Sequence, residues 1–472
     1  MNSVDICIIG GGPAGMAAAS MAAEEGLRVA LIDERPSAGG QTYRGLEDGP
    51  FREESNLGSD YSDGSVIIER FRAANIEALF GASLWRVDMT ENGGFASYSR
   101  NGIAHRLAFR KLILATGAVE RAVAFEGWML PGVMSVGAAQ LLLKSSAAVP
   151  SGKIVLAGNG PLLLLFATQL LSLGIEISAI LDTAPKVSKI AVALKNLGGF
   201  ISNRDKVKKG LRMQRDIRAA KIPIHRNVSQ LRATGGNRVA AIMYEANGKQ
   251  NVIDADTLLY HEGVLPNTQL SLAVGCKQIW DESQKCHKPE TDQFGESSVA
   301  GVFIVGDGAT INGAIAAPPS GEIAVGRILE QINRATDRSR GIVSRSNKTI
   351  RIEKAFRPFL DQLYPPRIAV APVSDATIVC RCEEVSAGKL RAAIKDGAIG
   401  PSQAKVYTRC GMGPCQGRMC GLLVSQLIAH ETGQSIAEIG SYNVRYPLKP
   451  VTLLEMAQCG EAEDYIENQH AS

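Results

Sequence analysis

The chain has 472 residues and carries 51 Lys and Arg against 47 Asp and Glu, a net charge of +4. So small an excess does not indicate binding to nucleic acid or to a membrane surface. No apolar run reaches the 18 or more residues of a membrane-spanning helix. The hydrophobic fraction of 45% suits sizeable cores, and the length predicts about three domains. Because no basic, apolar leader precedes the first predicted strand, we expect a cytoplasmic protein.

The first stretch has the order strand, glycine turn, helix, strand. An apolar run at 4–9 leads into a G-x-G-x-x-G turn, and a second apolar run ends at Asp33. In such a turn the first glycine makes the bend, the second lets the backbone approach a pyrophosphate, and the third lets helix and strand pack closely. Asp33 is placed to accept hydrogen bonds from a ribose. The pattern predicts a dinucleotide site, whose turn consists of Gly10, Gly12, Pro13, Ala14 and Gly15.

Three later segments are expected to touch the same ligand. A glycine pair follows Asp33 and permits a second close approach of the backbone. A buried strand at 111–114 ends in small residues, and an apolar strand at 301–305 ends in Gly-Asp, whose carboxylate could bond a ribityl hydroxyl. The candidate residues in these segments are Glu34, Gly40, Gln41, Ala115, Thr116, Gly117, Gly306, Asp307 and Ala314.

A second strand-turn-helix unit begins at Lys153. Gly158 and Gly160 repeat the first two glycines of the fingerprint, but Leu163 occupies the third glycine position. A leucine there should push the helix away from the strand or clash with a pyrophosphate. We therefore expect the same architecture with an impaired nicotinamide-nucleotide site.

The order of these units predicts one domain inserted into another. The basic, Ser-rich stretch at 334–354 is expected to be a solvated linker, with helical spacing over 352–363. The expected boundaries are 1–125 for the first part of the dinucleotide domain, 126–297 for the inserted domain, 298–335 for the second part, 336–370 for a linker with a helix, and 371–472 for a cysteine-rich domain with a tail.

Five of the nine cysteines fall between 380 and 420. In a cytosolic chain such clustering favours a metal site over disulfides. Cys380 and Cys382 are spaced C-x-C, and Cys415 and Cys420 are spaced C-x4-C, so four soft thiolates can converge. Structural zinc more often uses C-x2-C to C-x4-C spacing, so the C-x-C pair counts against zinc. We therefore favour a [2Fe-2S] cluster over zinc or no metal. Cys410 is treated as a bystander.

Over nearly its whole length the chain resembles the A (alpha) subunits of heteromeric amino-acid dehydrogenases, which include opine (octopine or nopaline) oxidase, hydrogen cyanide synthase and D-hydroxyproline dehydrogenase. Its first part is similar to two-domain flavoprotein disulfide reductases, and its cysteine-rich end to bacterioferritin-associated-ferredoxin-type [2Fe-2S] domains. The segments that carry the resemblance are GGGPAG at 10–15, Asp33, GGQ at 39–41, ATG at 115–117, GD at 306–307, ATGAVERAVAFEGWMLPGV and TRCGMGPCQGRMCG.

The resemblance implies an α/β fold with two nested Rossmann-like domains and a small C-terminal [2Fe-2S] domain. It implies FAD at the first glycine motif and a cluster on Cys380, Cys382, Cys415 and Cys420, with FMN at the interface with a partner as a further candidate. That partner would be a beta subunit whose flavin oxidises an opine-like amino acid, alone or with a small third subunit. Electrons would leave to a quinone or another acceptor, and no catalytic residue is assigned to this chain.

Two alternatives stay open at this point. One is a self-contained NAD(P)H-dependent flavoenzyme, against which Leu163 argues. The other is a non-catalytic, zinc-bearing scaffold. Dithiol–disulfide exchange is not expected, because Cys276 and Cys286 are ten residues apart and no C-x-x-C pair lies near the flavin motifs.

Overall fold

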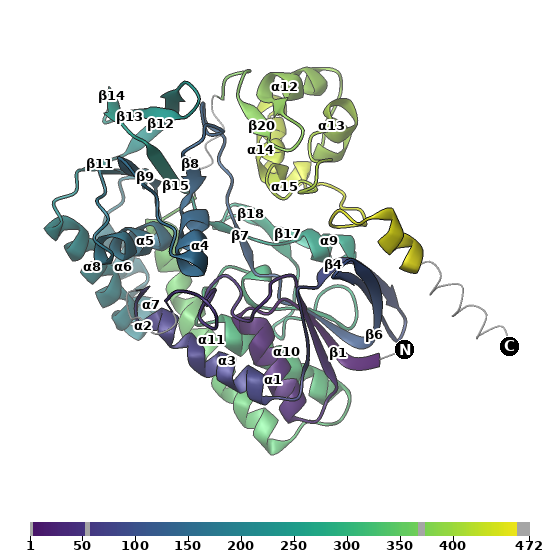
Figure 1. Ribbon diagram of the computed structural model, residues 1–472. Helices are drawn as coiled ribbons and strands as arrows, with labels where there is room; N and C mark the ends of the chain where they lie inside the picture. Colours follow the sequence, from purple (N-terminus) through teal and green to yellow (C-terminus); the bar gives the residue numbers. More distant parts are fainter. Residues whose placement is uncertain (1–2, 52–56, 367–372, 460–472) are drawn as a thin grey trace.

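The computed structural model describes residues 3–51, 57–366 and 373–459. The expected domain start at 371 and the last residues of the expected tail lie outside these ranges. Figure 1 shows three parts: a first domain that contains the N-terminus, a second domain beside it, and a small helical domain above the first. Within the described ranges, no helix is both long and apolar enough to cross a membrane.

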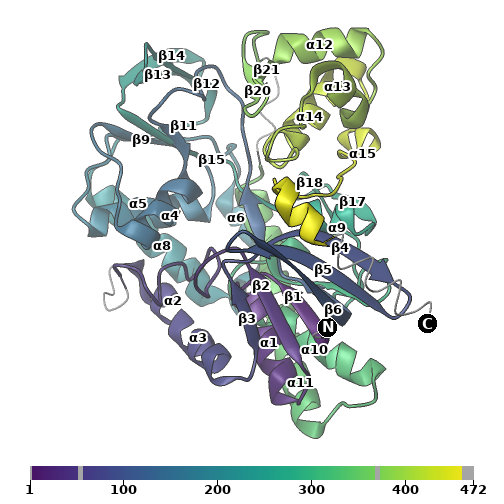
Figure 2. The ribbon, with the colours of Figure 1, turned by 45° about the vertical axis from the view of Figure 1, so that its right-hand side comes forward.

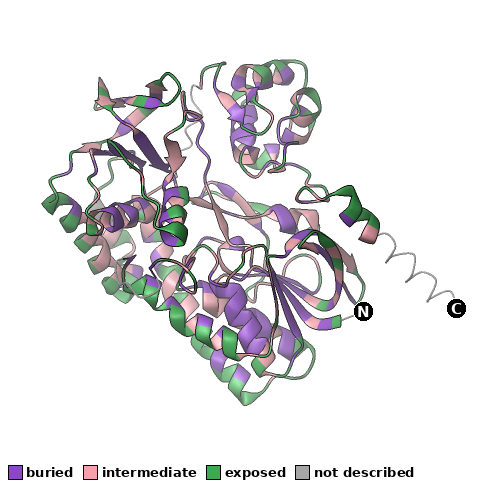
Figure 3. Cartoon of the chain, in the orientation of Figure 1, coloured by how far each residue is buried: buried purple, intermediate pink, exposed green. Residues whose placement is uncertain are grey.

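The first domain is built on a seven-stranded sheet in the order β3-β2-β1-β6-β5-β4, with β19 paired to β6. The β1, β2, β3, β6 and β19 pairings are parallel, and β4 to β6 form an antiparallel meander. Helix α1 packs against α10, and both are largely buried in the core (Figure 3). The bounds are β1 Ser3–Ile9, α1 Pro13–Glu24, β2 Val29–Asp33, α3 Gly64–Ala73, β3 Glu77–Phe80, β4 Ser83–Thr90, β5 Gly93–Arg100, β6 Ile103–Leu114, β19 Val302–Ile304 and α10 Ala317–Gln331.

The second domain repeats this plan with a five-stranded parallel sheet in the order β11-β10-β9-β15-β8. A three-stranded antiparallel sheet, β12-β13-β14, stands at its edge. The bounds are β8 Val133–Ser135, α4 Val136–Ser146, β9 Ile154–Gly158, α5 Pro161–Ser172, β10 Ala179–Asp182, α6 Lys189–Lys195, α7 Leu197–Ser202, α8 Arg204–Ala219, β11 Ile224–Arg226, β12 Val228–Gly235, β13 Val239–Ala246, β14 Lys249–Asp254 and β15 Thr257–His261.

The chain returns to the first domain earlier than the expected boundary at 297. The two crossover strands, β7 (Ala118–Glu120) and β16 (Val264–Pro266), pair antiparallel with each other. After β16, Leu270 and Cys276 pack into the core of the first sheet. The elements α9 (Gln269–Ala273), β17 (Gln278–Asp281) and β18 (Cys286–Pro289) therefore belong with the first domain (Figure 1).

The stretch expected to be a solvated linker is a 27-residue helix, α11 (Asp337–Leu363). Its start is fixed by a capping box between Thr336 and Ser339, and it packs against α10 and α7. Phe356 and Phe359 are buried under α6 and α7. The basic side chains of 334–354 thus lie on the outside of a docked helix, which is why composition alone suggested a linker.

The C-terminal domain consists of a short hairpin and small helices. Its core is continuous with that of the second domain, and Trp128 Nε1 donates a hydrogen bond of 2.7 Å to the Ile378 carbonyl. Beyond α15 the chain runs back over the first sheet, where Leu448 N donates to Trp85 O (Figure 2). The bounds are β20 Ile378–Cys380, β21 Val385–Ser386, α12 Ala387–Lys395, α13 Pro401–Thr408, α14 Gly421–Thr432 and α15 Ile436–Ile439.

Candidate functional site

The three fingerprint glycines have different surroundings. Gly10 has φ +113°, and a Cβ on it would lie 2.3 Å from the Ala115 carbonyl oxygen. A Cβ on Gly15 would lie 1.9 Å from the Gly10 carbonyl oxygen, so only glycine lets α1 pack this closely on β1. The nearest heavy atom to a Cβ on Gly12 would be Gly40 Cα, at 3.9 Å. Gly10 and Gly15 therefore serve packing, whereas Gly12 leaves a space that a ligand could fill.

The acidic end of β2 is held by backbone groups. The Asp33 carboxylate accepts hydrogen bonds from Gly11 N at 2.5 Å and from Arg35 N at 2.8 Å. Its neighbour Glu34 forms an ion pair with Lys449 of the C-terminal segment. Asp33 thus lies beside the glycine turn, as its place at the end of the second apolar run predicts. The contact with Lys449 could not be foreseen, because that residue is more than 400 positions away.

The other candidate segments converge on the same turn. A Cβ on Gly306 would lie 3.0 Å from the Ala14 Cβ, and one on Gly308 would lie 3.1 Å from Thr116 Oγ1. Asp307 Oδ1 accepts the N–H groups of Asn312 and Gly313, each at 2.9 Å, and desolvation raises the pKa of this carboxyl. These backbone N–H groups orient the carboxylate at the edge of the dinucleotide turn.

Two expected ligand contacts are less central. The side chain of Gln41 is exposed, and Ala314 is half-buried. Lys144 of α4 reaches this loop from the second domain: its Nζ lies 2.9 Å from Thr42 O and 3.4 Å from Gln41 O. Burial lowers the pKa of Lys144 from its ordinary value of 10.5 to about 8. This lysine joins the two domains at the glycine-pair loop, and nothing in its local sequence marked it.

The corresponding edge of the second domain is filled by side chains. Asn159, Thr183 and Glu262 directly follow the carboxyl ends of β9, β10 and β15, where nucleotides bind in such sheets. Glu262 accepts hydrogen bonds from Asn159 Nδ2 at 2.9 Å and from Thr183 Oγ1 at 2.7 Å. Next to them, His261 Nδ1 lies 2.6 Å from Glu120 Oε1. These polar groups satisfy one another inside the chain.

The turn before α5 also follows a different path. Gly160 has φ +111°, whereas its counterpart Gly12 has φ −77°. Leu163, at the third glycine position, is only 2% exposed and packs into the core. The structure thus shows how the leucine is accommodated: the turn changes its conformation. A pyrophosphate would not meet the arrangement of N–H groups found in the first domain.

The five clustered cysteines gather in the C-terminal domain. The Sγ atoms of Cys380, Cys410 and Cys420 all lie within 4.8 Å of one another, and all three residues are buried. Hydrogen bonds from the Cys410 and Cys420 thiols lower the pKa of Cys380 to about 2. Cys382 lies beside Cys415, to which it is hydrogen-bonded. The structure therefore places the supposed bystander Cys410 inside the sulfur group.

Tyr442 supports the loop that carries these cysteines. A Cβ on Gly411 or on Gly417 would lie 2.6 Å from its ring, and its hydroxyl lies 3.9 Å from Cys420 Sγ. A Cβ on Gly413 would lie 2.3 Å from the Cys382 Cβ. The loop glycines thus make room for an aromatic ring and a cysteine, a role that the spacing of the cysteines does not reveal.

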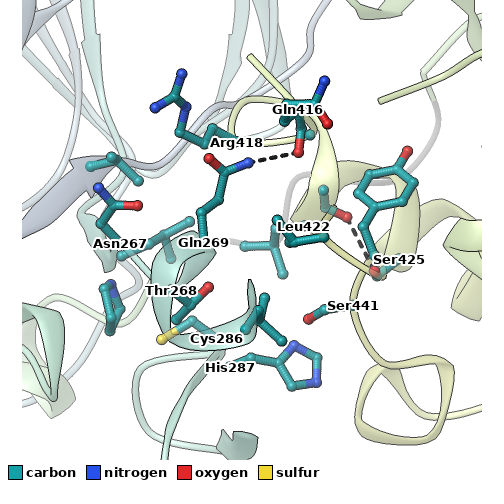
Figure 4. A pocket seen from close by; sticks show the side chains of 18 residues that line it. Asn267, Thr268, Gln269, Cys286, His287, Gln416, Arg418, Leu422, Ser425 and Ser441 are labelled. Carbon is teal, nitrogen blue, oxygen red and sulfur yellow. Dashed lines mark hydrogen bonds between the residues drawn. The ribbon is translucent and has the colours of Figure 1, made fainter. Parts of the chain in front are cut away.

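One short segment joins the cysteine loop to the dinucleotide domain. Thr116 Oγ1 donates to Asn267 O at 3.0 Å, and two residues later Gln269 Nε2 donates to Cys415 O at 3.2 Å and Gln416 O at 2.6 Å. Figure 4 shows Gln269 directed at Gln416 across the wall of a cavity of about 90 Å³. The cysteine loop is therefore attached next to the strand end that the ATG motif forms.

Comparison with known proteins agrees with this architecture. Residues 4–337 match the family described as pyridine nucleotide-disulphide oxidoreductase, and residues 374–459 match the sarcosine oxidase A3 domain. The A subunit of opine oxidase from Rhizobium meliloti (strain 1021) is 38% identical over 98% of this chain and 100% of its own length. The chain belongs to the family of opine oxidase A subunits. This membership confirms the resemblance inferred from the motifs and makes the chain an oxidoreductase-family subunit.

One further sequence relative and one solved structure are also similar to this chain. Hydrogen cyanide synthase subunit HcnB of Pseudomonas aeruginosa is 31% identical over 94% of this chain and 96% of its own length. Among solved structures, L-proline dehydrogenase from P. horikoshii superimposes with a TM-score of 0.72 at 21% identity, over 96% of this chain and 79% of that one. The similarity to L-proline dehydrogenase is one of fold, and it confirms the expected α/β class.

Proposed function

We propose that this chain is the FAD- and [2Fe-2S]-containing electron-transfer subunit of a heteromeric dehydrogenase that oxidatively cleaves opines. The observation that carries the proposal is its similarity, over its whole length, to the A subunit of an opine oxidase. In the proposed complex the amine site lies mainly on a beta subunit, with or without a small third subunit. Electrons leave through this chain to a quinone or another acceptor.

The residues present fit the two groups. The space at Gly12, the carboxylates of Asp33 and Asp307, and the small residues at 115–117 would hold FAD. The five clustered cysteines, three of which have their sulfurs within 4.8 Å of one another, offer enough soft ligands for one [2Fe-2S] cluster. Bound together, the two groups would supply one- and two-electron redox chemistry.

We assign the cluster to Cys380, Cys382, Cys415 and Cys420, the ligand set that the family resemblance implies, although the Cys410 sulfur lies within 4.8 Å of those of Cys380 and Cys420. The protein's own part in this function is positional. Gln269 fixes the cysteine loop against the segment that accepts the hydrogen bond of Thr116, so one short segment contacts both proposed cofactor sites. Short separation and rigid placement are what electron transfer requires of a protein, and neither needs an acid or base.

The proposal is tested by co-purifying the chain with the products of neighbouring genes and assaying dye reduction with octopine, nopaline, hydroxyproline and glycine. Activity with octopine or nopaline that requires the partner supports it. Preference for glycine would favour a hydrogen cyanide synthase, and preference for hydroxyproline a D-hydroxyproline dehydrogenase. Activity of the isolated chain on any of these amines would refute the division of labour.

The same preparation tests the self-contained alternative. The filled polar edge at Glu262 and the altered turn at Gly160 argue against a hydride donor in the second domain. We therefore expect NAD(P)H to leave the flavin of the isolated chain oxidised under anaerobic conditions. Rapid bleaching of the flavin by NAD(P)H would contradict this expectation.

A further inference from the structure

Helices α6 and α7 are apolar on two sides. On the inner side, Val192 and Phe200 pack on Phe359 of α11, and Gly199 lies so close that its Cβ would meet the Ala355 carbonyl oxygen at 1.9 Å. The outer side carries four large apolar residues at helical spacing that are 51–75% exposed: Ile190, Leu194, Leu197 and Ile201. A packed helix that leaves a second apolar face exposed to water is typical of an interaction site.

The same region is strongly basic. Residues 186–221 contain eleven Lys or Arg and two Asp, a local net charge of +9, whereas the whole chain carries +4. On α8 the exposed face presents Arg204, Lys208, Arg212 and Arg215 around the exposed Leu211. Some cations of the segment form ion pairs, with acids inside it or outside it: Lys208 with Asp205, Arg215 with Asp216, Lys206 with Glu353 and Lys209 with Asp60. The cations still outnumber these acids, so the small overall charge conceals one concentrated positive surface.

We propose that α6, α7 and α8 form an interfacial surface by which this chain binds the headgroups of an anionic phospholipid membrane. An apolar face bordered by Lys and Arg is the pattern of helices that lie in the plane of a membrane surface, with the apolar side chains inserted below the headgroups. The inference goes beyond the proposed function and does not depend on it.

The position of the surface favours lipid over the partner subunit. In Figure 1 the helices α6 and α8 lie at the lower left of the second domain, whereas the cysteine domain lies at the upper right of the molecule. A partner that exchanges electrons with the cofactor sites would contact the cysteine side. Nucleic acid would account for the basic charge but not for four exposed aliphatic residues. A membrane surface satisfies both features at once.

The test is flotation of the purified full-length chain with vesicles of phosphatidylglycerol and phosphatidylcholine, and with vesicles of phosphatidylcholine alone. We expect binding to the anionic vesicles only. The double variant Ile190→Ser/Leu194→Ser should weaken binding tenfold or more, and Arg212→Gln about fivefold, the effect of one charge near an anionic surface. The control Val252→Ser removes an apolar side chain that is 63% exposed on β14 and should bind as the unaltered chain does.

A second measurement guards against a misfolded double variant. An environment-sensitive fluorophore on Leu197→Cys should shift to the blue with anionic vesicles, while one on Val252→Cys should not. Failure of the unaltered chain to float would overturn the proposal, as would binding that Arg212→Gln weakens but the Ile190 double variant does not. A crosslink from position 190 to a co-purified subunit would show that this surface binds a protein, and it would also overturn the proposal.

Discussion

Replacing either of two glycines of one turn by alanine should impair a different property: Gly15→Ala should lower stability, and Gly12→Ala should lower flavin binding. A Cβ on Gly15 would stand 1.9 Å from the Gly10 carbonyl oxygen, so α1 would have to move by more than about 1 Å to restore van der Waals contact. Overpacking of this kind costs about 1–3 kcal/mol, which corresponds to a fall in Tm of about 2–12 °C for a domain of this size. Gly12 has φ −77° and an open surrounding, so Gly12→Ala should cost under about 1 kcal/mol.

Flavin binding should rank the two variants in the opposite order from stability, with Gly12→Ala the more affected. The methyl group of Gly12→Ala points into the space that we assign to the pyrophosphate, so this variant should be folded but free of flavin. The assay is the Tm of each apoprotein together with the flavin released per chain by heat. If Gly12→Ala keeps a full complement of FAD, or if Gly15→Ala leaves the Tm of the apoprotein unchanged, the assignment of the two roles is wrong.

Three further predictions concern residues that the fold brings to the site. Because the pKa of Lys144 is lowered to about 8, the unfolded chain binds more protons between pH 8 and 10.5, so stability should rise with pH through this window. The free energy of unfolding should rise by about 3 kcal/mol across this window. Measured from urea midpoints, the rise should be absent in Lys144→Met and present in the exposed control Lys195→Met. Cys410→Ser should keep its iron under our ligand assignment, whereas iron loss as complete as in Cys420→Ser would make Cys410 a ligand. Gln269→Ala should shift the reduction potential of the cluster in an EPR titration, with recovery in Gln269→Asn, and an unaltered potential would remove its positioning role.

The first domain could be predicted because its signals are local. The turn at 10–15 and Asp33 lie within one strand-turn-helix-strand unit, where chemistry and spacing are set by neighbours in sequence. The later strand ends at 115–117 and 306–307 were predicted to lie beside the same turn because small residues follow buried apolar strands. The structure places all of them around one turn.

Contacts between distant segments could not be predicted in this way. Lys144, Gln269 and Tyr442 act through partners more than 20 residues away, and each looks ordinary among its neighbours. Cys410 was set aside because spacing shows which sulfurs can converge but not which do. In the helix α11, the docking surface depends on α7 and α10, so a basic composition suggested solvent where the structure has a packed helix.

Average quantities concealed a further feature. The net charge of +4 argued against a charged surface, although residues 186–221 carry +9. Opposite charges elsewhere in the chain cancel in the sum but do not neutralise a surface that lies beyond a Debye length of about 8–10 Å. Charge has to be counted by surface before partners are excluded.

The measurement that bears most directly on the account is the content of iron, acid-labile sulfide, zinc and flavin in the chain isolated anaerobically with its partners. We predict iron and labile sulfide in equal amounts, together with FAD and without zinc. Zinc in the absence of iron and sulfide, or a preparation without flavin, would contradict the claim that this subunit conducts electrons.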